Sequence, residues 1–221
     1  MLAKDLISDT IPALKTSDTG LTALNLMELF RVSHLPIVNH AEFLGIISDA
    51  DIYDMNMAEE PIGNHRLSLL SPYVVSTQHI FEVIEIISRL KLSVVPVLDE
   101  KKNYIGLITL MDLTQKFATI IAVNNPGGLI ILEMSVNDYT LSEISQIIEG
   151  NDGKILSLYV STSVDSTKIH VIIKTNKTDL SGIIQTFLRY NYNIKGTFSK
   201  DNLLDDYLDD RFDSFLRYLN T

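Results

Sequence analysis

Two hydroxyl-x-x-aspartate pairs, Ser48/Asp51 and Thr109/Asp112, are the residues whose types and spacing best suggest chemistry. At the start of a helix such a pair is a capping arrangement, because the hydroxyl accepts from first-turn amides and the aspartate favours the positive end of the dipole. A carboxylate also offers two acceptor oxygens, which match the adjacent 2′ and 3′ hydroxyls of a ribose. The hydroxyl and the free amides at the helix start can face a phosphate. The pairs therefore predict two helix starts and two candidate ligand positions.

Both pairs lie in an internal repeat. Residues 33–38 (Ser-His-Leu-Pro-Ile-Val) recur sixty positions later as residues 93–98 (Ser-Val-Val-Pro-Val-Leu). Residues 45–52 recur as residues 106–113, an offset of sixty-one, so the second copy has one extra residue between the two blocks. Insertions of this kind belong in hairpin tips. The chain thus carries two copies of one unit, expected at residues 1–60 and 61–122.

Each copy has the pattern of a β-α-β-β-α unit. A short extended run precedes a helix, a strand begins at the proline, a second strand begins at the glycine, and a second helix starts after Ser48 or Thr109. Neither copy is long enough to bury both faces of its sheet alone, so we expect the two copies to pack against each other.

These units resemble a pair of cystathionine-β-synthase-type (CBS) domains. The resemblance covers Met1 to about Ala118 and rests on the repeated proline, glycine, hydroxyl and aspartate. It implies that Asp51 and Asp112 hold ribose and that Ser48 and Thr109 lie near ribose or phosphate. It also implies an adenosine-containing ligand such as AMP, ADP or ATP, with no other cofactor required. Three apolar residues are candidates to sandwich the base: Ile47, Ile108 and Val95.

The position before the Leu-Pro of the first copy is His34, and its counterpart in the second copy is Val94. Some nucleotide-binding CBS repeats carry a basic side chain here, which makes His34 a candidate phosphate contact. The alternative is a surface or interface histidine, because a partly charged imidazole is a poor substitute for arginine's fixed fork. With so little positive charge nearby, we expect a ligand with few phosphates or none.

The second half of the chain begins after a breaker cluster, Asn-Asn-Pro-Gly-Gly, within a hinge expected at residues 123–128. Residues 129–200 then follow the order β-α-β-β-α-β, a ferredoxin-like split unit, so the whole chain is α/β followed by α+β. This order resembles an ACT domain, and the domain order resembles the acetoin-utilisation protein B group. Amino-acid-binding ACT domains have a glycine in the loop before the first helix, and residues 136–140 have none. We therefore expect an ACT-like domain that dimerises or couples without a ligand.

The last segment, residues 201–221, has the pattern of an acidic amphipathic C-terminal helix. Aspartates occupy one side, and the apolar side is formed by Leu204, Leu208, Phe212 (or Arg211), Phe215 and Leu219. We expect this helix to dock on its own domain, with a partner-binding or dimer helix as the alternative.

Composition narrows the function classes. The chain of 221 residues is 46% hydrophobic and 21% charged, as in globular proteins, and has no cysteine, which excludes disulfides and thiolate chemistry. A formal charge of −10 argues against nucleic acid as a partner. With no signal peptide and no apolar run of about 20 residues, we expect a cytoplasmic protein without a membrane partner.

No recognisable catalytic motif or metal-ligand spacing is present among the five histidines or elsewhere. The sequence therefore predicts a non-catalytic regulatory protein, an allosteric sensor that binds an adenosine nucleotide and relays this to the ACT-like domain or to a protein target. A homodimer is expected, because two-fold assembly is the commonest solution. The alternatives are a structural adaptor with empty clefts and an undetected enzyme.

Overall fold

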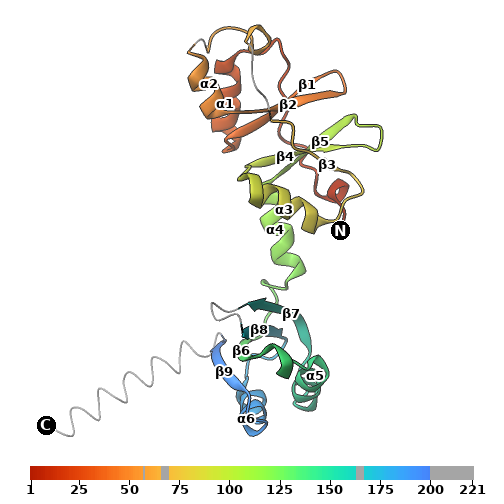
Figure 1. Ribbon diagram of the computed structural model, residues 1–221, viewed down its shortest axis with the longest axis vertical. Coiled ribbons are helices and arrows are strands. Elements are labelled where there is room, and N and C mark those ends of the chain that lie inside the picture. Colours follow the sequence, from red (N-terminus) through yellow and green to blue (C-terminus); the bar gives the residue numbers. More distant parts are fainter. Residues whose placement is uncertain (57, 66–69, 163–166, 200–221) are drawn as a thin grey trace, which may run out of the picture. The chain divides into compact units, whose positions relative to one another are not determined.

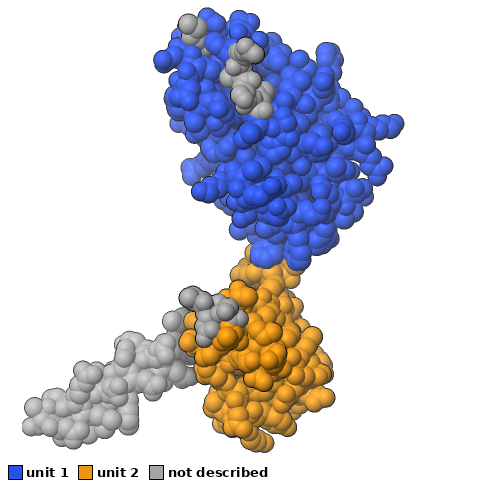
Figure 2. Space-filling view, in the orientation of Figure 1, with its two compact units in different colours: residues 1–117 blue, residues 118–221 orange. Residues whose placement is uncertain are grey.

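The computed structural model describes residues 1–56, 58–65, 70–162 and 167–199. The chain divides into two compact units, residues 1–117 and 118–221, coloured blue and orange in Figure 2. Each unit has its own hydrophobic core and is described by itself. The expected C-terminal helix at residues 201–221 lies outside the described residues.

The first repeat consists of α1 (Gly20–Phe30), β1 (His34–Asn39), β2 (Glu42–Ser48) and α2 (Asp49–Met55). Thr19 begins α1 by accepting a hydrogen bond from the Thr22 amide, and Arg31 ends it in the left-handed conformation at φ 54°. Strands β1 and β2 form an antiparallel hairpin, and Leu14 bridges β1 in parallel as the short extended run that precedes α1. The core of this repeat contains Leu14, Ala23, Met27, Leu35, Ile37, Ile47, Ile52 and Ile62.

The second repeat has the same order: β3 (Val74–Val75), α3 (Ile80–Leu90), β4 (Val94–Leu98), β5 (Tyr104–Thr109) and α4 (Leu110–Ile120). Strand β3 pairs in parallel with β4, and β4 pairs antiparallel with β5. The predicted β-α-β-β-α repeats are confirmed. The core of this repeat contains Ala3, Leu6, Val74, Ile80, Val83, Ile87, Val95, Val97, Ile108 and Leu113.

The segment that precedes each repeat crosses to the other repeat, a feature that the sequence pattern did not predict. The Ser8 amide donates to the Leu107 carbonyl of β5 over 2.8 Å, and the Ile46 amide of β2 donates to the Leu70 carbonyl over 2.9 Å. A short 3₁₀ helix, η1 (Ala3–Leu6), places its apolar side chains in the core of the second repeat. The two repeats are therefore interlocked rather than merely stacked.

The second unit is a four-stranded antiparallel sheet with two helices. Its elements are β6 (Leu129–Ser135), α5 (Leu141–Gly150), β7 (Ile155–Thr162), β8 (Lys168–Thr175), α6 (Ser181–Arg189) and β9 (Asn193–Phe198). The strand order is β7-β8-β6-β9, and every neighbouring pair is antiparallel. This is the topology of the ferredoxin-like split unit, so that prediction is confirmed.

Both helices of this unit pack on the same face of the sheet (Figure 1). Alternate residues of β6 and β8 point to that face because side chains alternate along a strand. Phe187 of α6 is fully buried there and makes an edge-to-face contact with Tyr192 at a centroid distance of 5.2 Å. The opposite face of the sheet has no helix over it among the described elements.

Candidate ligand-binding site

The first hydroxyl-aspartate pair caps α2. The Ser48 hydroxyl oxygen accepts from the Asp51 amide over 3.1 Å, and the Ser48 hydroxyl donates to Asp51 Oδ2 over 2.6 Å. The Ser48 amide donates to the same Oδ2 over 2.8 Å. These reciprocal bonds form a capping box, with aspartate in the place of the more usual glutamate. The carboxylate is exposed and is held in one orientation at the positive end of the helix.

The second pair repeats this arrangement at the start of α4. The Asp112 amide donates to Thr109 Oγ1 over 2.9 Å, and the Thr109 hydroxyl donates to Asp112 Oδ2 over 2.8 Å. Thr109 is buried and Asp112 is half-buried, so this pair is less open to solvent than Ser48 and Asp51.

In both pairs the hydrogen bonds within the described residues end on Oδ2, so they leave Oδ1 as an acceptor. An acceptor oxygen fixed at a helix start, beside first-turn amides, can take a hydroxyl group of a ligand. The structure therefore gives each repeat the same oriented acceptor at the position that the sequence predicted.

His34 lies between the two repeats. Its Nδ1 atom is 3.1 Å from the hydroxyl oxygens of both Ser33 and Ser93, and the Ser93 amide donates to it over 3.3 Å. The Ser33 amide in turn donates to the Ser93 hydroxyl oxygen over 3.0 Å. Because Nδ1 accepts from an N–H group, the proton of the neutral ring is on Nε2. Sequence reasoning missed the two serines, although their sixty-residue offset marks them as equivalent positions of the repeat.

Burial lowers the pKa of His34, and the nearby charges of Asp49 and Asp51 only partly oppose this shift. The ring is therefore neutral at pH 7 and brings no full positive charge to the site. This arrangement matches the interface alternative for His34, and only its Nε2–H group is left to contact a ligand.

The three apolar candidates do not line an open surface. Ile47, Ile108 and Val95 are each 0% exposed, and they lie in the hydrophobic cores of their own repeats. Side chains alternate along a strand, so Ile47 points away from the side of the hairpin that carries Ser48. Ile108 and Thr109 are related in the same way, and Val95 is the cross-strand partner of Ile108. All three are core residues in this structure, and their role in sandwiching a base stays a prediction.

An open cavity of about 480 Å³ lies beside the serine-histidine contact. It is lined by Arg31, Ser33, Asp49, Tyr53 and Ser93, together with Leu24, Met27, Glu28 and Val32. None of the predicted site residues lines this cavity, although two of its lining residues, Ser33 and Asp49, adjoin His34 and Ser48 in the sequence. Sequence reasoning did not single out Arg31 or Tyr53, whose ring is exposed beside this cavity.

Within the described part of the chain, His, Asp and Glu side chains do not gather in groups of three or more that could hold a metal ion. None of the described helices is long and apolar enough to cross a bilayer.

The paired geometry agrees with a comparison against known families. Residues 3–57 and 68–119 each match the CBS domain. Residues 3–119 form a tandem CBS domain pair. The C-terminal unit that follows this CBS pair is a β-rich α+β region.

Three similar solved structures are a CBS domain pair/ACT domain protein from Thermotoga maritima, CBSX2 in complex with AMP, and an acetoin utilization protein (AcuB) from Vibrio cholerae. Their sequence identities to this chain are 19%, 18% and 20%, with TM-scores of 0.48, 0.46 and 0.47. The alignments cover 54%, 54% and 56% of this chain and 98%, 97% and 95% of the other chains. The assignment of the CBS pair rests on the family match and not on these likenesses.

Proposed function

We propose that the CBS pair binds an adenosine-containing ligand and that the protein is regulatory rather than catalytic. One observation carries the proposal: each repeat holds an aspartate at a helix start with its Oδ2 bonded internally and its Oδ1 left as an acceptor. An oriented acceptor of this kind can take a hydroxyl of a ribose, and the CBS pair presents it twice.

Charge narrows the class of ligand. The chain has a formal charge of −10, His34 is neutral, and Asp49 and Asp51 both lie near it. A triphosphate without its metal ion would meet net repulsion at this position. We therefore favour AMP or an adenosine compound without a phosphate chain over ATP.

The test is calorimetric titration of the full chain with AMP, ADP, ATP and S-adenosylmethionine. AMP belongs in the panel because CBSX2 was solved with it. Losing a charged acceptor for a ribose hydroxyl costs about 1.5–3 kcal/mol, so Asp51→Asn and Asp112→Asn should each weaken one site about tenfold to a hundredfold. Asparagine keeps an oxygen for the cap, which separates ligand contact from helix stability.

Asp54→Asn is the matched control, because Asp54 is exposed on the same helix and is not part of the capping box formed by Ser48 and Asp51. It should leave affinity unchanged. Failure of every compound to bind the folded full chain would refute ligand sensing and would favour a structural adaptor with empty clefts. The hydroxyl-aspartate bonds would then act only as helix caps.

We propose further that ligand binding is relayed to the ACT-like second unit, in a protein that acts as a homodimer. Helix α4 supports the relay, since it begins beside Asp112 and ends at Ile120, in the second unit. A relay needs two conformations of the protein in equilibrium. A ligand can shift this equilibrium only by the difference between its binding free energies for the two conformations, typically about 1–3 kcal/mol. Hydrogen exchange with saturating ligand should change protection in residues 129–198. A change confined to residues 1–117 would contradict the relay.

A further inference from the structure

The face of the second unit's sheet opposite α5 and α6 is apolar at its centre. The cross-strand register places Ile131 opposite Ile172, Ile172 opposite Tyr159, and Leu129 opposite Phe198, all on this open face. Phe198 is 59% exposed and Tyr159 is 36% exposed. An exposed apolar patch of this kind marks a surface that another element covers.

Residues 121–127 turn this face into a groove. The Ser157 hydroxyl donates to the Ile121 carbonyl over 2.9 Å, and Lys174 Nζ donates to the Gly127 carbonyl over 2.7 Å. These bonds hold the connecting segment along one side of a cavity of about 770 Å³. Val123, which lines it, is 57% exposed. All of the lining residues belong to the second unit.

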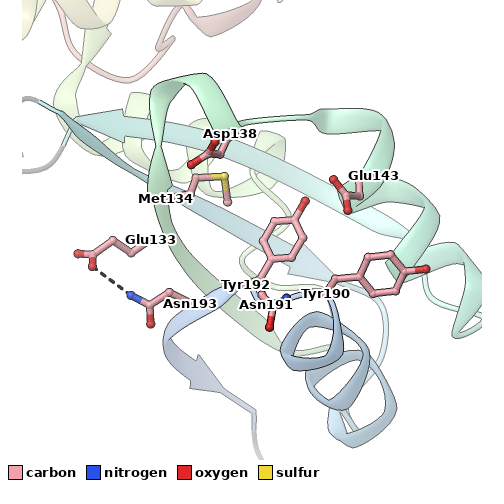
Figure 3. Close-up of a pocket in the computed structure, with 8 residues that line it drawn as sticks. All are labelled: Glu133, Met134, Asp138, Glu143, Tyr190, Asn191, Tyr192 and Asn193. Atoms are coloured by element: carbon pink, nitrogen blue, oxygen red, sulfur yellow. Dashed lines mark hydrogen bonds between the residues drawn. The ribbon is translucent and has the colours of Figure 1, made fainter.

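The charge beside this groove is positive although the chain as a whole is acidic. Glu133 on β6 lies 3.3 Å from Lys168 Nζ, 3.4 Å from His170 Nε2 and 3.5 Å from Lys195 Nζ. It also accepts from the Asn193 amide group over 3.1 Å, the dashed contact in Figure 3. With Lys174, three lysines stand against one carboxylate, and these four side chains carry a net charge of 3 − 1 = +2.

The segment after β9 complements this face in both respects. Residues 201–221 contain six aspartates and two arginines, a net charge of 2 − 6 = −4. At 100° per residue, Leu204, Leu208, Phe212, Phe215 and Leu219 fall within one apolar stripe. Asp205 and Asp209 flank this stripe, and Asp206 and Asp210 lie opposite it.

We propose that residues 201–221 fold back as a helix and cover the open face of the sheet. The segment starts beside the groove, because Phe198 and Ser199 line it. A helix over residues 201–219 would be about 28 Å long, close to the length of about 25 Å that an eight-residue strand spans. A second copy of the same face fits less well, since its lysines would meet those of the first.

The test uses the absence of cysteine from the natural chain. Tyr159→Cys puts a thiol in the middle of the groove, and its rate of reaction with a water-soluble disulfide reagent measures how well the face is covered. In the full chain, Leu208→Asp with Phe212→Asp should speed this reaction at least tenfold. The matched pair Asp206→Asn with Asp210→Asn, on the opposite side of the stripe, should not change it.

A second thiol shows that the effect is local. Gln185 is exposed on α6, on the far side of the sheet. The thiol of Gln185→Cys should therefore react at the same rate in the chain with the natural residues 201–221 and in the chain with Leu208→Asp and Phe212→Asp. A Tyr159→Cys/Leu208→Cys chain should form a disulfide within one 24.8 kDa chain, while Gln185→Cys/Leu208→Cys should not. Three results would each overturn the proposal. They are an equal reaction rate of the Tyr159→Cys thiol with and without Leu208→Asp and Phe212→Asp, protection of this thiol that rises with protein concentration, and a disulfide that forms only between chains. The second and third would identify another copy as the occupant.

Discussion

The contact between Ser33, Ser93 and His34 allows a sharp test of how the two repeats are joined. Ser33 and Ser93 are equivalent positions of the repeat, but the structure gives them different tasks. The Ser93 hydroxyl oxygen accepts from the half-buried Ser33 amide over 3.0 Å and also contacts His34 Nδ1. Within the described part of the chain, the Ser33 hydroxyl contacts only His34 Nδ1.

Replacing each serine with alanine should therefore have unequal effects. Ser93→Ala leaves the Ser33 amide without its acceptor, and an unsatisfied buried donor costs about 1–3 kcal/mol. Because this amide is only half-buried, water can reach it in part, and we expect about 1–1.5 kcal/mol. Ser33→Ala should cost less than about 0.5 kcal/mol, since Nδ1 has one lone pair and the Ser93 amide already donates to it.

Hydrogen exchange read by mass spectrometry is the suitable assay, because two units need not unfold together. The free energy of opening should fall for peptides that cover β1 (His34–Asn39) and β4 (Val94–Leu98), and peptides of the second unit should serve as the internal control. Equal losses for the two alanine variants would refute the hydrogen-bond assignment. No loss in either would show that this contact does not hold the repeats together.

Two further outcomes follow from single residues. The pKa of His34 is lowered in the folded state, so below its ordinary value of 6.5 the unfolded chain binds more protons than the folded chain. Stability of the first unit should be complete above pH 6.5 and fall as the pH is lowered toward the folded pKa, and His34→Gln should flatten that dependence in urea titrations. Gly127 has φ 135°, and an added Cβ would lie 1.9 Å from the Thr175 carbonyl oxygen, so Gly127→Ala should destabilise the second unit by more than about 1 kcal/mol in thermal unfolding. Gly150→Ala should not destabilise this unit in the same way, because its Cβ would meet nothing within 4 Å. Equal losses of stability in the two variants would contradict the steric reasoning.

The fold could be predicted from the sequence where the information is local or repeated. The sixty-residue offset showed two equivalent units, and the strand and helix periodicities gave the order of elements in both halves. The crossing of the N-terminal segment could not be predicted, because the partner of an extended run is not encoded in its own pattern. Ser8 pairs with Leu107 of the second repeat rather than with its own repeat.

The candidate site could be predicted only where its residues follow a local pattern. Ser48 and Asp51 follow from local capping chemistry, and the structure places them at the start of α2. The burial of Ile47 could not be foreseen from its hydrophobicity, because hydrophobicity alone does not say which side of a strand a residue faces. The alternation was available as a signal, since Ile46 and Ser48 share one side and Ile47 takes the other. The role of Ser93 depends on contact between the repeats and has no local signature.

Differences between the two copies bear on how many ligands the pair binds. Asp51 is exposed, and the Ser48 amide joins the hydroxyl in orienting its carboxylate. Asp112 is half-buried beside a buried threonine, and the counterpart of His34 in that copy is Val94, which offers no hydrogen bond. A ligand at the first copy can approach an open acceptor and the Nε2–H group of His34, whereas one at the second must reach a less accessible carboxylate without that donor. If the protein holds a single adenosine compound per chain, the proposed site at Asp51 is the one that should fill first, and Asp51→Asn should then lower affinity more than Asp112→Asn.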